Sequence, residues 1–190
     1  KERQYLTEDE IKAVMTHEFA DKKLAYIRDL FVFASFTALS FVDIKELTTD
    51  DIVEINGEKW ILSKRHKTKV NFQVKLLDIP LQIIKRYEKF QEDKLVFPNL
   101  NYWNICKPLK KMIKECGITK DISFHSSRHG FATLALSKGV PIESVSRVLG
   151  HTNITTTQKY AKITTEKIDM DLTMFGNRLN QSFSEISIAM

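Results

Sequence analysis

The chain has 190 residues, of which 43% are hydrophobic and 28% charged, with a formal net charge of +5 at pH 7. This composition is typical of a folded globular protein and excludes a disordered or collagen-like chain. No run reaches the ~18 consecutive apolar residues of a transmembrane helix, and no secretory leader is recognisable, so we expect a cytoplasmic protein built around one core.

Charge and cysteine content bear on partners and cofactors. An excess of Lys and Arg suits a protein that meets phosphates, although basic charge alone does not establish nucleic-acid binding. Cys106 and Cys116 are too few for a disulfide framework or a structural zinc site. We therefore expect reduced cysteines and no metal.

The first part of the chain predicts two helices followed by a small sheet. Thr7 and Glu10 form a capping-box pattern, so a helix should run from about residue 8 to about residue 17. Residues 22–40 are apolar on most faces and lack Gly and Pro, as in a buried central helix. In residues 51–80 the apolar side chains alternate, and Asn56-Gly57 is a strong hairpin signal. This pattern predicts three short antiparallel strands.

The rest of the chain is divided by Gly and Pro into helices. Pro108 indicates a kink or a later start in one of them, and Gly117 and Gly139 mark two helix ends. The predicted fold class is mainly α with a small three-stranded antiparallel sheet, an α+β domain. The predicted helices span residues 80–90, 101–116, 125–138, 141–150, 154–163 and 165–175.

Three basic side chains fall within one of these helices, in the stretch FHSSRHGFATLAL (residues 124–136). His125 and Arg128 are three residues apart and share a face, where both side chains can donate hydrogen bonds to one phosphate. A solvated helix face is the alternative. His129 has no third ligand nearby, so we do not expect zinc there. We expect His129 to be a buried structural residue on another side of the helix.

A second group of polar residues follows in VSRVLGHTNITTTQKYAKI (residues 145–163). His151 comes directly after Leu149-Gly150, and Tyr160 lies nine residues further on. A tyrosine phenol is a poor nucleophile unless nearby cations stabilise the phenolate and the phosphate it attacks. The alternative for Tyr160 is an aromatic side chain packed between surface and core.

Residues 125–164 together closely resemble the C-terminal signature of the tyrosine recombinases, also called the phage integrase family. The shared pattern is H-x-x-R-H, then F-A-T, L-x-x-x-G, V-x-x-x-L-G-H and a Tyr nine residues after that His. The resemblance covers roughly residues 5–170. It implies the integrase of a mobile element, a site-specific recombinase that cuts and rejoins DNA through a 3′-phosphotyrosyl intermediate and needs no cofactor.

The resemblance also implies a role for each matching residue. Those that would hold the scissile phosphate are His125 and Arg128, with His151 assisting and Tyr160 attacking. In the basic loop KRHKTK (residues 64–69), Lys67 matches the family lysine that protonates the 5′-hydroxyl leaving group. A positioned acid contributes a factor of about 10² to 10⁴.

The basic loop leaves alternatives open. Lys64 and Lys69 lie close enough in sequence to be mistaken for Lys67. A solvated hairpin tip that merely touches the DNA backbone would also look like this loop.

One position departs from the family pattern T-G-L-R-x-x-E-L. In TALSFVDIKEL (residues 37–47), Ala38 replaces the Gly and Ser40 occupies the arginine position. A serine brings no charge, so the phosphate clamp lacks one bidentate cation. Either another residue compensates or activity is impaired.

Two arginines are candidates for that compensation. Arg28 lies about 18 Å from Ser40 if the helix is straight, too far to reach unless the helix breaks, and a structural arginine paired with an acid is the alternative. Arg65 in the hairpin loop is the other candidate.

The resemblance implies a wider organisation as well. We expect residues 1–190 to form a single catalytic domain, with a core of about residues 5–170 and a tail over 171–190, and without the family's N-terminal core-binding domain. The expected partners are double-stranded DNA and further copies of the chain, which would be monomeric alone and tetrameric on DNA.

Two alternatives to a recombinase stay open. Residues 134–153 also look like a helix-turn-helix with Gly139 in the turn, which would suit a non-cleaving DNA-binding module. Such a module would explain Ser40 but not Tyr160 or the H-x-x-R pattern. A type IB topoisomerase is a more distant option.

Overall fold

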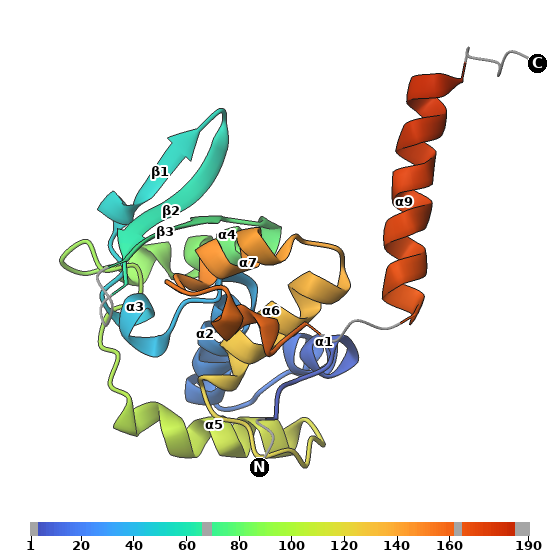
Figure 1. Cartoon of the computed structure of the whole chain (residues 1–190). Coiled ribbons are helices and arrows are strands. Elements are labelled where there is room, and N and C mark those ends of the chain that lie inside the picture. Colours follow the sequence, from blue (N-terminus) through green and yellow to red (C-terminus); the bar gives the residue numbers. More distant parts are fainter. Residues whose placement is uncertain (1–3, 66–69, 162–164, 185–190) are drawn as a thin grey trace, which may run out of the picture.

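The structure is a computed structural model that describes residues 4–65, 70–161 and 165–184. It is mainly helical, with a three-stranded sheet on one side and the long helix α9 at another edge of the body (Figure 1). The α-helices are α1 (Glu8–Thr16), α2 (Lys22–Thr37), α3 (Phe41–Lys45), α4 (Asp78–Tyr87), α5 (Trp103–Glu115), α6 (Ser126–Ser137), α7 (Ile142–Leu149), α8 (Thr155–Gln158) and α9 (Thr165–Phe183). The strands are β1 (Ile52–Ile55), β2 (Glu58–Lys64) and β3 (Asn71–Lys75), and short 3-10 helices lie at η1 (Thr49–Asp51) and η2 (Glu88–Phe90).

The sheet confirms the three predicted antiparallel strands, in the order β1-β2-β3. Asn56 and Gly57 join the first two strands with φ values of 53° and 77°, as the two central positions of a type I′ hairpin turn require. On β2 and β3 the side chains of Ile61, Phe72 and Val74 are buried. The inner face of the sheet therefore packs on the helical body.

The helix α2 is the centre of the core, as its apolar sequence predicts. Phe31, Phe33 and Leu30 are fully buried in it, and α2 packs against α1, α4, α5 and α6. It ends at Thr37, and Ala38 follows in the left-handed conformation with a φ of 57°. Ala38 stands where the pattern T-G-L-R-x-x-E-L has Gly, and a residue with a Cβ adopts this conformation at some cost in strain.

Local capping explains why the first helix starts where the sequence predicts. The backbone N–H of Thr7 donates to Glu10 Oε2 at 2.7 Å, and the Glu10 N–H donates to the Thr7 hydroxyl at 3.3 Å. Both bonds of the capping box are present, so the predicted start of α1 is confirmed.

Several of the predicted helices differ in their bounds. The helix predicted over residues 154–163 is much shorter, because α8 ends at Gln158 and Tyr160 lies in the turn after it. Pro108 lies inside α5, which begins at Trp103 without a later start. The last helix is longer than predicted and continues to Phe183.

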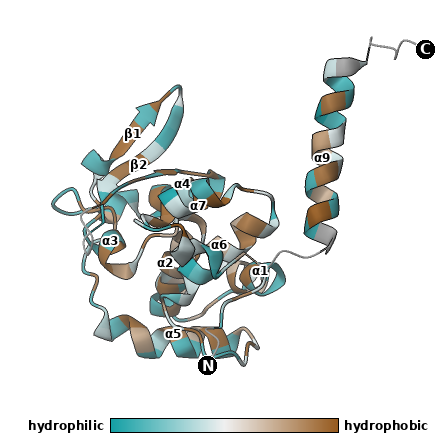
Figure 2. Ribbon diagram, viewed as in Figure 1, coloured by the Kyte–Doolittle hydropathy of each residue, from teal (hydrophilic) through white to brown (hydrophobic). Residues whose placement is uncertain are grey.

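One side of α9 faces the α6–α7 region, where Lys167, Met170 and Asp171 line a hollow with Gly139 and Ile142. Figure 2 shows hydrophobic residues along the length of the helix. Its exposed apolar residues are Ile168, Met170, Leu172, Met174, Phe175 and Leu179. Within the described part of the chain, no helix combines the length and the apolar character needed to cross a membrane.

Candidate active site

Two turns that are distant in sequence form the base of the candidate site. The first joins α2 to α3, where Ser40 caps α3: its hydroxyl accepts from the Asp43 N–H at 3.3 Å, and the Ser40 N–H donates to Asp43 Oδ2 at 3.1 Å. The second turn ends α7 at Gly150, which has a positive φ of 62°. The last carbonyl groups of a helix carry partial negative charge and attract cations.

Arg128 spans these two turns from α6. Its Nη1 donates to the Ala38 carbonyl at 2.9 Å, and its Nη2 donates to the Leu149 carbonyl. Burial lowers the Arg128 pKa to about 10, with repulsion from Arg65 acting in the same direction. The guanidinium therefore stays charged at neutral pH.

Arg65 spans the same two turns from the end of β2. Its Nη1 donates to Asp43 Oδ2 at 2.6 Å, and its Nη2 donates to the Val148 carbonyl. The guanidinium carbon lies 3.9 Å from the centre of the Phe72 ring, and the side chain is buried. Burial lowers the pKa of Arg65, while Asp43 raises it.

Asp43 links Arg65 to the position where the family has its first arginine. The same Oδ2 atom that accepts from Arg65 accepts from the Ser40 hydroxyl at 2.7 Å. The Nε of Arg65 is buried and has no acceptor among the described residues. Arg65 thus brings a cation beside Ser40 and retains a donor for a further oxygen.

His151 follows Gly150 directly and faces the same cations. Its Nδ1 lies 2.8 Å from the Thr157 hydroxyl. Burial, together with the nearby charges of Arg128, Arg65 and Lys159, lowers the His151 pKa to about 4. At neutral pH the imidazole is therefore uncharged.

A row of three rings leads to Tyr160. The ring centres of His125 and His129 are 4.8 Å apart, and those of His129 and Tyr160 are 5.2 Å apart. Tyr160 is half-buried, and its charge as a phenolate raises the pKa of Arg128. We expected His129 to be a buried structural residue on another side of the helix, but it is half-buried and contacts both rings.

Arg28 does not belong to this group, which corrects its candidacy as a phosphate ligand. Its Nε donates to Asp29 at 2.6 Å, and its Nη1 donates to the carbonyls of Met15 and His17. Asp29 is buried and also accepts from Arg86 and Tyr87, each at 2.7 Å. Arg28 is thus the structural arginine of an acid-centred network.

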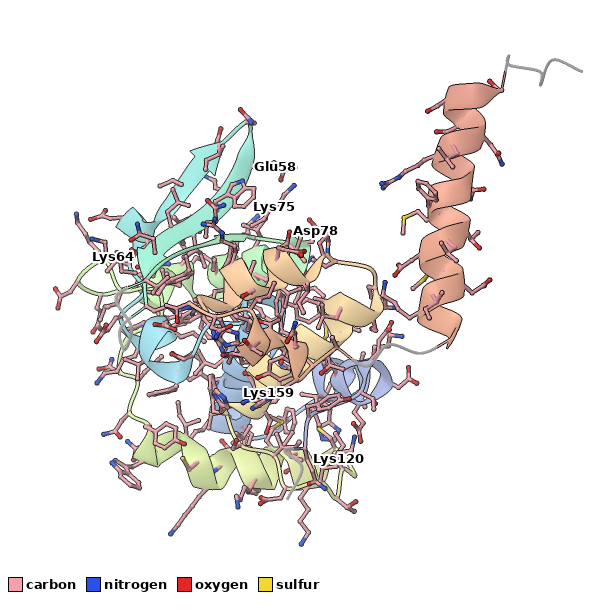
Figure 3. All side chains as sticks on the ribbon, in the orientation of Figure 1. Glu58, Lys64, Lys75, Asp78, Lys120 and Lys159 are labelled. Carbon is pink, nitrogen blue, oxygen red and sulfur yellow. The ribbon has the colours of Figure 1, made fainter. Side chains whose placement is uncertain are left out.

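Of the three loop lysines that the sequence suggested, the structure describes only Lys64. Lys64 is exposed at the end of β2, at the base of the hairpin in Figure 3, because alternation along the strand turns it away from the face that carries Arg65. Lys67 and Lys69 lie outside the described residues. Lys159, which the sequence analysis passed over, comes directly before Tyr160 and contributes positive charge at His151.

These side chains suit a tetrahedral oxyanion. Two guanidinium groups and a neutral imidazole provide hydrogen-bond donors, and a tyrosine lies beside them. Among the residues that the structure describes, no group of His, Cys, Asp and Glu is arranged to hold a metal ion.

The chain is similar to known proteins in both sequence and fold. The family model described as "Phage integrase family" matches residues 4–167. The chain belongs to the phage integrase family. Relatives in this family include a tyrosine recombinase of Thermosipho africanus, 29% identical over 171 residues that make up 87% of this chain and 59% of that protein. Tyrosine recombinase XerC of Myxococcus xanthus is 30% identical over 141 residues, 66% of this chain and 47% of that protein.

This phage integrase chain therefore spans about half the length of the curated relatives it matches. Solved structures share its fold. The XerH site-specific recombinase bound to its difH substrate has a TM-score of 0.71 at 22% identity, over 90% of this chain and 54% of that one. The Tn1549 transposon integrase in complex with a circular intermediate DNA has a TM-score of 0.75 at 18% identity, over 92% of this chain and 66% of that one.

Proposed function

We propose that this chain is the catalytic part of a site-specific DNA recombinase that acts as the integrase of a mobile element. The observation that carries the proposal is the convergence of Arg65, Arg128, His151 and Tyr160, from four separate segments, on the two turns of the site. Relatives support it, since the XerH recombinase and the Tn1549 integrase were solved with DNA. The proposal includes a location in the cytoplasm.

In the proposed reaction, the Tyr160 oxygen attacks the scissile phosphorus and the bond to the 5′ oxygen breaks. The phenol loses a proton and the leaving oxygen gains one, so rejoining is the same step in reverse and needs no cofactor. Arg128 and Arg65 stabilise the charge on the phosphoryl oxygens, and His125 and neutral His151 donate hydrogen bonds to them. Lys67 supplies the proton to the leaving oxygen.

We propose further that Arg65 replaces the arginine that the family pattern has at Ser40. Both arginines of the site use the same two turns: each donates one hydrogen bond to the α2–α3 segment and one to an α7 carbonyl. The buried Nε of Arg65 supports this role, because a phosphate oxygen would supply the acceptor it lacks among the described residues. Ser40 would contribute through Asp43.

The proposed assembly is several copies of the chain on DNA, as a tetramer. Residues 168, 172, 175 and 179 on α9 carry exposed apolar side chains at spacings of four, three and four. This spacing places them along one side of the helix. A second copy of the chain is the partner we propose for this stripe, with the core of about residues 5–170 as the catalytic domain.

A covalent-trapping experiment tests the function. The chain is incubated with a pool of end-labelled duplexes of randomised sequence, each carrying a nick one to three nucleotides from its centre, so that cleavage releases a short fragment and rejoining fails. A protein–DNA adduct that survives denaturation and is absent in Tyr160→Phe supports the recombinase, and sequencing the trapped DNA gives the site.

Other outcomes separate the alternatives. Sequence-selective binding without an adduct would support the non-cleaving DNA-binding module. Relaxation of supercoiled plasmids of unrelated sequence would support a type IB topoisomerase. Either result would replace the proposed function.

A further inference from the structure

We infer that an aromatic hollow beside the phosphate site holds an unstacked nucleobase of the DNA strand next to the scissile phosphate. The inference rests on the proposed DNA substrate but not on cleavage. The hollow has a volume of about 800 Å³ and lies between α3, the start of α5 and the segment before α6. Its lining includes Ser40, Phe41, Lys45, Tyr102, Trp103 and His125.

The hollow is continuous with the candidate active site. Ser40 and His125 line it, and Ser40 is also bonded to the Asp43 carboxylate that holds Arg65. At the other end of the histidine row lies Tyr160. A strand whose phosphate meets Tyr160 and the arginines would therefore bring its neighbouring nucleotide past His125 and into the hollow.

The aromatic rings in this region form a series that runs from core to surface. The centre of the Phe41 ring lies 5.5 Å from that of Phe124 and 5.3 Å from that of Tyr102, and Tyr102 lies 6.1 Å from Trp103. The exposed fraction rises from 3% at Phe124 and 8% at Phe41 to 43% at Tyr102 and 81% at Trp103. The exposed indole lies beside the partly exposed Tyr102 ring, which in turn packs on buried Phe41, so the rings offer a stacking surface for a base.

Trp103 is also fixed in place by its backbone. It is the first residue of α5, and its N–H donates to the Asn101 side-chain oxygen at 3.0 Å. This hydrogen bond stabilises the turn that carries the Trp103 side chain. The ring is thus presented by an ordered helix start.

The charges in the hollow favour a base over a phosphate. Lys45 and Glu46 both line it, and their opposite charges leave no net positive charge there. The positive charge lies instead beside the hollow, at Arg65 and Arg128. Every base, whatever its identity, has a π-face that stacks on aromatic side chains. One nucleotide could therefore place its phosphate on the arginines and its base in the hollow.

Tryptophan fluorescence tests the inference without requiring cleavage. The background variant is Trp60→Phe with Tyr160→Phe, which leaves Trp103 as the only tryptophan because the chain has two. Two single strands are titrated: oligothymidylate of twelve nucleotides, and an abasic strand with the same number of phosphates. We expect oligothymidylate to quench Trp103 and the abasic strand to leave its emission almost unchanged.

Binding measurements complete the test. Trp103→Leu should weaken oligothymidylate binding by about tenfold and leave abasic-strand binding unchanged, since stacking is lost and phosphate contacts remain. Phe90→Leu is the matched control, because Phe90 is an exposed aromatic, 65% accessible, that does not line the hollow. Equal quenching by both strands, unchanged affinity in Trp103→Leu, or no binding of oligothymidylate would overturn the inference.

The result is independent of the trapping experiment. Base-dependent quenching without any Tyr160 adduct would retain the hollow and reject the recombinase. A Tyr160 adduct without base-dependent quenching would support the recombinase and reject the base-binding role of the hollow.

Discussion

Gly150 and Arg65 are so close that any larger residue at position 150 would displace the arginine. A Cβ on Gly150 would lie 2.8 Å from Arg65 Cγ and 3.0 Å from its Nε. The backbone there also has a positive φ of 62°. The glycine of the L-G-H motif therefore serves two purposes in this chain: it ends α7, and it leaves room for the hairpin arginine.

The contact predicts the effect of Gly150→Ala. We expect a loss of about 1–2 kcal/mol in the free energy of unfolding from the left-handed backbone, and a fall in adduct formation of at least tenfold because Arg65 is pushed out. Urea unfolding and trapping kinetics measure the two. Gly117→Ala is the control, since Gly117 has a similar φ of 75° and open space around it. Equal losses of activity in both variants would contradict the displacement of Arg65.

Arg65 and Arg28 should respond differently to substitution. Arg65→Ala should lower the cleavage rate by about 10²- to 10³-fold, because the charge on the phosphate is no longer stabilised. Arg65→Lys should retain only part of the parent's cleavage rate, because lysine lacks the bidentate guanidinium group. Arg28→Ala should lower the free energy of unfolding by about 1–3 kcal/mol, because the buried Asp29 loses one of its hydrogen-bond donors. The variant that does fold should cleave DNA at the normal rate. Single-turnover trapping and urea unfolding separate the effects.

A double variant tests whether Arg65 replaces the family arginine at position 40. Adding Ser40→Arg to Arg65→Ala returns a guanidinium to the family position and should restore part of the lost cleavage, at a cost of about 1 kcal/mol for the lost cap of α3. Full activity in Arg65→Ala alone would remove Arg65 from the reaction.

The lowered pKa of His151 predicts a pH dependence of stability. Between its folded pKa of about 4 and the ordinary value of 6.5, the unfolded chain binds a proton at His151 that the folded chain does not. Stability therefore rises with pH through this window and is lost as the pH falls from 6.5 towards 4. His151→Asn should lose less stability than the parent between pH 7 and 5 in urea unfolding; identical profiles would show that His151 titrates normally.

Lys67 can be tested by changing the leaving group instead of the protein alone. Lys67→Ala should slow cleavage by about 10²- to 10⁴-fold on normal DNA. A substrate with sulfur in place of the 5′ bridging oxygen should restore the rate, because a thiolate leaves without a proton. Lys64→Ala and Lys69→Ala should retain cleavage of normal DNA, and a rescue pattern in either of them would assign the acid to that residue.

The apolar stripe of α9 predicts that Leu172→Glu with Phe175→Glu weakens self-association on DNA. Two charges would be placed against an apolar surface of the second copy, which is unfavourable without partners. Sedimentation on a trapped DNA site should show fewer copies per DNA than for the parent. Asn177→Glu, on an exposed polar residue of the same helix, is the control. Unchanged assembly in the double variant would exclude the stripe as the contact.

Local chemistry made much of the fold predictable. The Thr7–Glu10 capping box and the Asn56-Gly57 turn depend on residues a few positions apart, and both occur as predicted. The end of α8 was missed because the Thr-rich stretch before Tyr160 has no Gly or Pro to mark it. Ring contacts such as that between His129 and Tyr160 depend on how helices pack, which spacing along one helix does not reveal.

The sequence named Arg65 as a candidate but could not choose between it and Arg28. The signal was present in the strand alternation, since Ile61, Ser63 and Arg65 fall on one face of β2 and Ile61 is buried. What no local pattern contains is the pairing with Asp43 and the α7 carbonyl, 22 and 83 residues away in sequence. Only the folded chain brings those acceptors together.

The α7 carbonyls that bind both arginines come late in the chain, after residue 147. A ribosome that has translated this chain only as far as residue 147 has made both guanidinium groups but neither of these two acceptors, nor Tyr160. A product truncated before residue 148 consequently has neither the anchored cation pair nor Tyr160. The anchoring of both arginines is therefore one of the later steps in the folding of a nascent chain.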